Sequence, residues 1–347
     1  MALIQSAWML VPVAACLWCA GDDPRAAAEA NTGLELARAG KYEQAIAHYR
    51  AALKLEPAMP GLELNLGLAY FKLNRFGEAI PAFEQAVKAD AASFQARVLL
   101  GMSYYETRRF ADAAAQLKRA AAEQPDNTEL RFRLAQSYLW SKQYDAAKEE
   151  FRFLLARNPD SAPVHMLLGE VLDAANQQEQ ATAEFEAAVK AGPHEPEAHF
   201  GLGYLYWKQK RYDEARREME AELADQPQHT QALAYLGDAE MHSGNETRAE
   251  EHLRRALRLD AKMRLAHLDL GIVLAERNAN EEAARHFQEA IRLDPSKTDA
   301  HYRLGRLWLA MGREREAEAE FAQVKKLARA DQPEAPPEPL INVPVRK

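Results

Sequence analysis

Cysteine is nearly absent from this chain of 347 residues, whose two cysteines are Cys16 and Cys19. The rest of the sequence therefore offers no disulfide bond and no thiolate ligand for a metal. Cys16 and Cys19 have the spacing of half a zinc site, but no second pair of cysteines follows them. A redox function would need a strand followed by a helix around the pair, which the flanking residues do not indicate. We expect neither a metal nor a cofactor.

Basic residues are fewer than acidic residues in this chain. The chain has 44 Lys and Arg against 52 Asp and Glu, a formal net charge of −8 and a sequence pI of about 5.8. Nucleic-acid binding needs a basic surface that displaces counterions, so this balance excludes a general nucleic-acid partner. The 48% hydrophobic and 28% charged residues are typical of an ordered, soluble chain that can bury a core.

Motifs of the common enzyme classes are missing as well. His194 and His199 lie five residues apart, whereas the histidines of a zinc-protease helix lie four apart and so share one face. Gly201 and Gly203 lack the third glycine of a dinucleotide-binding turn and follow no strand pattern. No phosphate-binding loop and no nucleophile elbow occurs. We expect a protein that is not an enzyme, with no catalytic, cofactor-binding or metal-binding residues.

The first twenty residues carry no charged side chain, and Asp22 and Asp23 end this apolar run. Such a run is typical of an export signal, although no lysine or arginine precedes Arg25. We therefore expect a leader over residues 1–25 and an exported bacterial protein, periplasmic or attached to a membrane only through this segment. The alternative is a cytoplasmic protein with an apolar leader.

Cys16 is a candidate lipidation site within this leader. The residues Val-Ala-Ala that precede it make the segment similar to the lipobox of bacterial lipoproteins, in which the cysteine becomes the lipidated first residue. Cleavage near Ala20 and an uncleaved anchor remain open, because a stretch of twenty apolar residues is just long enough to span a bilayer.

A period of 34 residues dominates the rest of the sequence. Glycine recurs at this interval or at twice it, with Ala135 in the one gap: Gly33, Gly67, Gly101, Gly169, Gly203, Gly237, Gly271 and Gly305. Each is followed twelve residues later by an alanine: Ala45, Ala79, Ala113, Ala147, Ala181, Ala215, Ala249, Ala283 and Ala317. Such a period predicts stacked supersecondary units in place of one globular core. The nine predicted units are 26–59, 60–93, 94–127, 128–161, 162–195, 196–229, 230–263, 264–297 and 298–331.

Each unit is expected to hold two helices. In the second unit, apolar residues on more than one face predict a helix over 64–73, and apolar residues at steps of three and four predict an amphipathic helix over 76–87. Asn74 forms part of the turn between them. Gly67 and Ala79 are small where the helices cross, and small side chains let helix axes approach to about 8–9 Å.

These spacings resemble the tetratricopeptide repeat over residues 26–331. The third unit carries the pattern in Leu100, Gly101, Tyr104, Ala113, Leu117, Ala120 and Pro125, and the sixth departs from it with Glu222 where a small residue is usual. The resemblance implies an all-α, right-handed superhelical solenoid of helix-turn-helix hairpins. It also implies that the first helix of each hairpin lines a concave face, which holds peptides or helices of other proteins.

On the groove-facing positions of the family, this chain presents aromatic and aliphatic side chains. The candidate partner-binding residues are Leu64, Leu68, Phe71, Val98, Met102, Tyr105, Phe132, Leu139, Trp140, Phe200, Tyr204, Trp207, Met241, Arg303 and Arg306. An exposed apolar patch rimmed by charge marks a partner site. The alternative is that Phe132 and Phe200 turn into the core between repeats. Arg303 and Arg306 either clamp an acidic group or pair with neighbouring carboxylates.

Residues 332–347 form a Pro-rich tail, with five prolines from Pro333 onward and an apolar island over 340–343 that could dock in the protein's own groove. Taken together, the sequence predicts a non-catalytic scaffold that binds apolar or amphipathic segments of partner proteins in a concave groove. The alternative is a regulatory or assembly subunit of a multiprotein, envelope-associated complex whose catalysis lies on another chain.

Overall fold

The computed structural model describes residues 23–330, and over these residues the chain forms 18 α-helices and no β-strand. The prediction of an all-α fold is confirmed. The predicted leader with Cys16 and the predicted Pro-rich tail lie outside the described residues. The helices are α2 (Pro24–Arg38), α3 (Tyr42–Leu55), α4 (Leu62–Lys72), α5 (Phe76–Ala89), α6 (Phe94–Glu106), α7 (Phe110–Glu123), α8 (Thr128–Trp140), α9 (Tyr144–Leu155), α10 (Ala162–Ala174), α11 (Gln178–Ala191), α12 (Ala198–Lys208), α13 (Tyr212–Asp225), α14 (Thr230–His242), α15 (Glu246–Leu259), α16 (Arg264–Glu276), α17 (Asn280–Leu293), α18 (Thr298–Ala310) and α19 (Glu314–Ala330).

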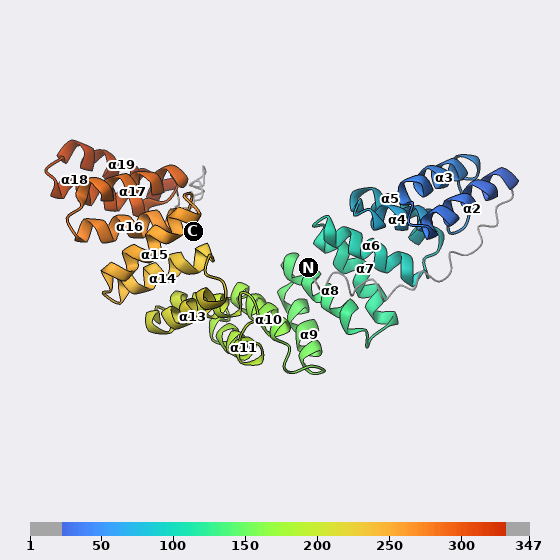
Figure 1. Cartoon of the computed structure of the whole chain (residues 1–347), viewed down its shortest axis with the longest axis horizontal. Helices are drawn as coiled ribbons and strands as arrows, with labels where there is room; N and C mark the ends of the chain where they lie inside the picture. Colours follow the sequence, from blue (N-terminus) through green and yellow to red (C-terminus); the bar gives the residue numbers. More distant parts are fainter. Residues whose placement is uncertain (1–22, 331–347) are drawn as a thin grey trace, which may run out of the picture. The chain divides into compact units, whose positions relative to one another are not determined.

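The helices fall into two compact units, which divide between Ala191 and Gly192. Unit 1 holds α2 to α11, and unit 2 holds α12 to α19. Within each unit, every even-numbered helix forms a hairpin with the odd-numbered helix that follows, which packs in turn on the next even-numbered helix (Figure 1). We call the even-numbered members the first helices and the odd-numbered members the second helices of the hairpins. None of the helices within residues 23–330 combines the length and the apolar character that crossing a membrane requires.

Except in the hairpin of α8 and α9, which has Ala135 at this position, the first helix of each described hairpin carries a glycine against a large side chain of its second helix. A Cβ atom added at Gly67 would lie 2.6 Å from the ring of Phe83, and one added at Gly271 would lie 2.6 Å from the ring of Phe287. Real Cβ atoms do not approach a ring so closely, since protein interiors are already close-packed. The predicted role of the periodic glycines as close-approach sites is therefore confirmed.

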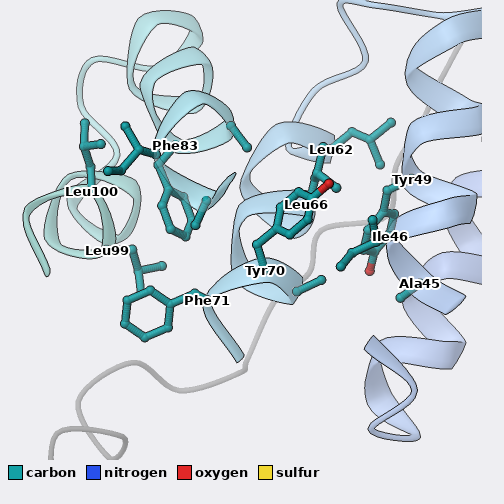
Figure 2. Packing of buried hydrophobic residues seen from close by; sticks show 14 of the residues in the cluster. Ala45, Ile46, Tyr49, Leu62, Leu66, Tyr70, Phe71, Phe83, Leu99 and Leu100 are labelled. Carbon is teal, nitrogen blue, oxygen red and sulfur yellow. The ribbon is translucent and has the colours of Figure 1, made fainter. Parts of the chain in front are cut away.

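Side chains of three successive helices interlock between the hairpins. Figure 2 shows Leu62 and Leu66 of α4 directed towards Ile46 and Tyr49 of α3, while Phe71 lies beside Leu99 of α6. A first helix thus contacts the second helix before it as well as its own partner. Because each hairpin buries its apolar surface mainly against its neighbours, stability within a unit is close to a sum of nearest-neighbour interfaces.

The turn inside each hairpin uses one residue with left-handed backbone. The φ angle lies between 56° and 78° at nine positions that are 34 residues apart: Gly40, Asn74, Arg108, Lys142, Asn176, Lys210, Gly244, Asn278 and Gly312. This conformation lets the next N–H donate back to a carbonyl at the end of the first helix, as the Gln143 N–H does to the Tyr138 oxygen at 2.8 Å. Glycine and asparagine tolerate the left-handed region, whereas arginine and lysine are strained in it.

Replacing Lys142 by glycine should therefore stabilise the protein by about 0.5–1 kcal/mol, because it removes the strain of a φ of 61° at an exposed residue. The measurement is the midpoint of urea unfolding. Gly244→Ala is the matched control, with the opposite sign expected from a φ of 78°. Equal midpoints for all three proteins would contradict the assignment of strain to this turn.

Candidate functional site

The first helices of unit 1 present part of the predicted groove surface. Leu64, Leu68, Met102, Tyr105 and Phe132 are half-buried. Trp140 is 49% exposed, which makes it one of the most exposed large hydrophobic residues among those described. The side chains of this surface that reach solvent therefore come from α4, α6 and α8.

Around Trp140 the aromatic side chains form an edge on unit 1. The Phe110 ring lies 6.3 Å from the Trp140 ring and 5.4 Å from the Tyr105 ring, centroid to centroid. The Arg133 guanidinium lies 5.6 Å from the centre of the Tyr105 ring. Burial raises the pKa of Tyr105, although Arg133 opposes this effect. Tyr105 is therefore a neutral hydrogen-bonding group beside an exposed indole.

Three predicted groove residues of unit 1 are instead part of its core. Phe71, Val98 and Leu139 are 6%, 8% and 6% exposed. The Phe71 ring packs edge-on against Phe76 at 5.1 Å and Phe83 at 6.3 Å, both on α5. The space between the helices is filled by these side chains, which leaves little of them to a partner. The candidate surface of unit 1 is narrower than the sequence indicated.

Unit 2 gathers four aromatic residues on two adjacent first helices. Phe200, Tyr204 and Trp207 follow each other at steps of four and three on α12 and so share a face, and Tyr235 of α14 faces them. The Tyr235 centroid lies 4.9 Å from that of Trp207, 5.3 Å from that of Tyr204 and 6.1 Å from that of Phe200. All four side chains are half-buried. We call these four residues the aromatic cluster.

Two buried carboxylates lie beside the aromatic cluster, and we call Asp238 of α14 and Asp269 of α16 the carboxylate pair. They are 4% and 3% exposed. The Trp207 indole N–H donates to Asp238, and His242 Nε2 lies 3.6 Å from the Asp238 carboxylate. In contrast, Oδ2 of Asp269 is buried without a hydrogen-bond partner.

The pKa of each carboxyl group in the pair is raised. For Asp238 the cause is burial, opposed by the Trp207 hydrogen bond and by His242. For Asp269 the pKa is raised well above its ordinary value, first by burial and then by the charges of Asp238 and Asp299. Burial also raises the pKa of Tyr235 to about 12, with Tyr204 and the carboxylate pair adding to the effect. Asp238, Asp269 and Tyr235 are therefore close enough to interact electrostatically.

The remaining predicted groove residues of unit 2 lie on α14 and α18. Met241 is half-buried, and Arg303 and Arg306 are exposed. Among residues 23–330, neither guanidinium forms an ion pair with a carboxylate. The interpretation in which both arginines pair with neighbouring acids is therefore not supported in this part of the chain. Phe200 does not turn fully inward either, since it stays half-buried with its ring centroid 4.6 Å from that of His229.

Glu197, Glu222 and His229 form a cluster near the start of α12 that could suit a metal, since their ligand atoms lie within 4.8 Å of one another. His229 Nδ1, however, accepts the Ala232 N–H at 3.1 Å and so caps α14. The proton must then be on Nε2, which donates to Glu197 at 3.0 Å and has no lone pair for a metal. These hydrogen bonds account for the cluster, and we assign no metal to it.

Glu222 has a structural role that explains why it replaces a small residue. The residue before α12, Glu197, has a φ of 69° and makes no side-chain cap. Glu222 of α13 supplies the missing acceptor, with Oε2 taking the Phe200 N–H at 3.1 Å and Oε1 the Gln226 amide at 2.5 Å. A carboxylate at a helix N-terminus also interacts favourably with the helix dipole. Glu222 therefore holds the helix that carries most of the aromatic cluster.

Changing Glu222 to alanine, the usual kind of residue there, should lower the free energy of unfolding by about 1–2 kcal/mol because α12 loses its cap. Glu222→Gln keeps an acceptor oxygen and should lose less. Amide hydrogen exchange at Phe200 is the local readout, and it should accelerate only in the alanine variant. Unchanged exchange in that variant would contradict the role in capping.

Several residues of this surface were not on the predicted list. Tyr235 and Asp269 occupy the sixth position of their units, whereas the apolar candidates were chosen at or next to the fifth, ninth and twelfth positions of units up to the seventh. Tyr302 and Leu309 of α18, which are 45% and 53% exposed, occupy the fifth and twelfth positions of the ninth unit, where only Arg303 and Arg306 were chosen. The aromatic residue type was the available signal for Tyr235, and the apolar residue type at a groove-facing position was the signal for Tyr302 and Leu309.

Comparisons with known proteins agree with the repeat spacing and the helical hairpins. One model of the tetratricopeptide repeat matches residues 31–96, 64–128, 173–221 and 200–264, which is more than half of the chain. A second matches residues 104–171 and 274–335. No curated protein matches the chain.

Solved structures show a likeness of fold alone at these identities. The protein pilF of Pseudomonas aeruginosa is 20% identical with a TM-score of 0.52, over 59% of this chain and 93% of that one. The C-terminal part of a repeat protein from Cytophaga hutchinsonii is 14% identical with a TM-score of 0.51, over 67% and 95%. YrrB, described as having an unusual peptide-binding site, is 22% identical with a TM-score of 0.45, over 53% and 95%. With 18 helices in tandem hairpins over residues 23–330 and repeat models matching more than half of the sequence, this chain belongs to the tetratricopeptide repeat family.

Proposed function

We propose that the chain is a non-catalytic scaffold that binds segments of partner proteins on the first helices of its hairpins. Proteins of this family generally mediate protein–protein interactions and are generally not catalysts. The single observation that carries the proposal is the aromatic cluster of unit 2. Aromatic side chains dominate the binding energy of protein interfaces because they bury a large area at a low cost in conformational entropy.

The aromatic cluster is rigidly supported, as a binding surface must be. Phe200, Tyr204 and Tyr235 pack on a core of Met219, Ala232 and Leu236. The hydrogen bond from Trp207 to Asp238 fixes the indole, and the Tyr204 and Trp207 rings stack at 5.9 Å. A surface that is already ordered loses little entropy when a partner binds.

Unit 1 supplies a second candidate surface around Trp140 and Tyr105. Its exposed indole and adjacent guanidinium suit an amphipathic segment, such as one face of a helix. We treat this surface separately from the aromatic cluster, because each surface can be tested by its own variants.

The experiment is a crosslinking pull-down from the native host that compares the wild type with Phe200→Ser/Tyr204→Ser/Trp207→Ser. Loss of most partner recovery is expected for this triple variant, since hot-spot aromatics each contribute about 2 kcal/mol or more. Leu55→Ser/Leu259→Ser is the matched control, because it removes exposed apolar side chains from second helices. Equal recovery by the triple variant, with its helical circular dichroism intact, would contradict the proposal. Recovery of a stable enzyme partner would instead favour the regulatory-subunit alternative.

We also propose export through residues 1–25, with lipidation at Cys16. The support is the uncharged apolar run and the Val-Ala-Ala-Cys segment. Mass spectrometry of the mature N-terminus tests both steps. A mature chain that begins at Cys16 with two or three acyl chains is expected, and an intact, unmodified Met1 would contradict export.

A further inference from the structure

The aromatic cluster and the carboxylate pair together form a surface with a definite charge preference. The rings are half-exposed, and their faces carry the negative side of the aromatic quadrupole. Asp238 accepts the Trp207 N–H, and both Asp238 and Asp269 act electrostatically on Tyr235 from a buried environment, where charges are poorly screened. Both features attract a positive charge and repel a negative one.

The charges that face Asp269 leave the carboxylate pair without a full set of partners. Asp238 and Asp299 add negative charge, while Arg264 and Arg303 add positive charge. Arg264 is already engaged, because its guanidinium forms an ion pair with Asp299. Arg303 is exposed and makes no ion pair within the described residues. Oδ2 of Asp269 has no hydrogen-bond partner, which is costly for a buried carboxylate.

We propose that the aromatic cluster receives a lysine or arginine side chain carried by the partner segment, with apolar residues on either side of it. The inference rests on the proposed function and adds the chemistry of the ligand. The cation lies over the rings of Tyr204, Trp207 and Tyr235, where cation–π attraction reaches about 6 Å from a ring centre. A nearby cation opposes the effect of burial on the pKa of Asp238 and Asp269 and favours their ionised forms, so the carboxylate pair supplies the compensating charge. The protein already shows this preference at the edge of the cluster, where Lys208 Nζ lies 5.6 Å from the centre of the Tyr204 ring.

Charge complementarity distinguishes a basic partner segment from an acidic or a purely apolar one. An acidic segment would place like charges near Asp238 and Asp269, and a purely apolar segment would leave the buried carboxylates uncompensated. A basic side chain flanked by apolar residues satisfies both parts of the surface.

The test begins with a library of random 12-residue peptides displayed on phage and selected on the full chain. Selected peptides are expected to share one lysine or arginine between apolar residues. For the best binder, Kd is measured by fluorescence anisotropy before and after its basic residue is replaced by norleucine or citrulline. The replacement should weaken binding to the wild type about tenfold or more.

The double variant Asp238→Asn/Asp269→Asn carries the decisive comparison. Asparagine keeps the size of each side chain and an acceptor for the Trp207 N–H, so the variant is expected to fold. The Kd values of the basic peptide and its neutral analogue for this double variant should differ by about twofold at most. Asp213→Asn, which changes an exposed carboxylate on α13, is the matched control and should behave as the wild type.

Arg303→Gln separates a basic ligand from an acidic one. Removal of this exposed positive charge should tighten binding of the basic peptide by a few fold, whereas a groove that clamps an acidic group would lose affinity. A chain lacking residues 333–347 should bind the peptide with unchanged Kd. A gain of tenfold or more would assign the site to the tail's own Arg346 and Lys347 and overturn the assignment to a partner.

The two proposals fail in different ways. If selected peptides need Phe200, Tyr204 and Trp207 but contain no basic residue, or tolerate norleucine, the cation assignment is overturned and the scaffold stands. If peptides bind the triple serine variant as tightly as the wild type, the proposed function itself is wrong.

Discussion

Replacement of Phe287 by alanine is expected to cost unit 2 about 3–5 kcal/mol of unfolding free energy. Phe287 of α17 is 1% exposed and packs against Gly271 of α16, where its ring fills the space that the absent Cβ leaves. Alanine would remove the whole ring and leave a cavity between the two helices of the hairpin. The surrounding helices can close such a cavity only in part, so the loss exceeds the transfer free energy of the ring.

The chain itself provides the control for this variant. The corresponding residue is leucine in two other hairpins, Leu117 and Leu253, and each packs against the glycine of its first helix. Phe287→Leu should therefore cost less than about 1.5 kcal/mol. The difference between the two variants measures the cavity and not the mere loss of an aromatic residue.

The loss should also be local. Because each hairpin contacts mainly its neighbours, amide hydrogen exchange should accelerate first in α16 and α17 and then in α15 and α18. Helices α2 to α11 of unit 1 should keep their protection. Uniform acceleration over residues 23–330 would contradict nearest-neighbour stability, and a loss below about 1 kcal/mol would contradict the close packing at Gly271.

The periodic features of the fold were predictable from the sequence because they are local. The small residue at each helix crossing and the turn fourteen residues after the start of each unit depend on residues of one hairpin. Glu222 stood out as a departure from the repeat for the same reason. What it does was not predictable, because its partner is the Phe200 N–H on a neighbouring helix and not a residue of the local pattern.

The exposure of the candidate partner-binding residues was predicted less well, because it depends on how far each first helix is rotated about its axis relative to the next first helix. Phe71 and Trp140 both occupy or adjoin the twelfth position of a first helix, yet one is 6% exposed and the other 49%. Phe71 packs against the rings of Phe76 and Phe83, whereas Trp140 lies at the end of α8, where the Phe110 ring is 6.3 Å away and leaves much of the indole exposed. Residue type and position alone do not distinguish these outcomes.

The carboxylate pair shows the same limit. Trp207 and Asp238 are 31 residues apart, and their hydrogen bond joins two first helices whose contact no single-unit pattern describes. Asp269 could be read from the sequence only as a polar residue at the sixth position. Its burial, and with it the charge preference of the surface, follows from the packing of α14, α16 and α18.

Stability of unit 2 should depend on the protonation of one histidine, His286 of α17. In three other hairpins a histidine of the first helix contacts a glutamate of the second: His165 with Glu184, His199 with Glu218 and His301 with Glu320, each at 2.6 Å. In the hairpin of α16 and α17, His286 replaces the glutamate, and its Nδ1 lies 2.9 Å from Nδ1 of His267. His267 Nε2 donates to the Ala261 carbonyl at 3.1 Å, so its Nδ1 accepts the proton of His286.

This arrangement disfavours a charged His286. Burial, followed by the neighbouring His267, lowers the pKa of His286 to about 4 from its ordinary value of 6.5. The unfolded chain therefore binds the proton more readily than the folded chain between these pH values. The contribution of neutral His286 to stability is complete above pH 6.5, declines as the pH falls towards 4 and changes no further below it. Between pH 7.5 and pH 5 the expected loss is about 2 kcal/mol.

The comparison of wild type with His286→Gln isolates this titration. Glutamine keeps a donor for Nδ1 of His267 but does not titrate. The raised pKa values of Asp238 and Asp269 change the stability with pH in the opposite direction, but they are present in both proteins and so cancel in the comparison. Urea unfolding at pH 7.5 and pH 5 should show the wild type losing about 2 kcal/mol relative to the variant. His286→Glu restores the histidine–glutamate pair of the other three hairpins, and its free energy of unfolding relative to the wild type should be higher at pH 5 than at pH 7.5. A difference between wild type and His286→Gln that stays constant with pH would mean that the folded protein accommodates the protonated ring, and the buried contact between two neutral imidazoles would then be wrong.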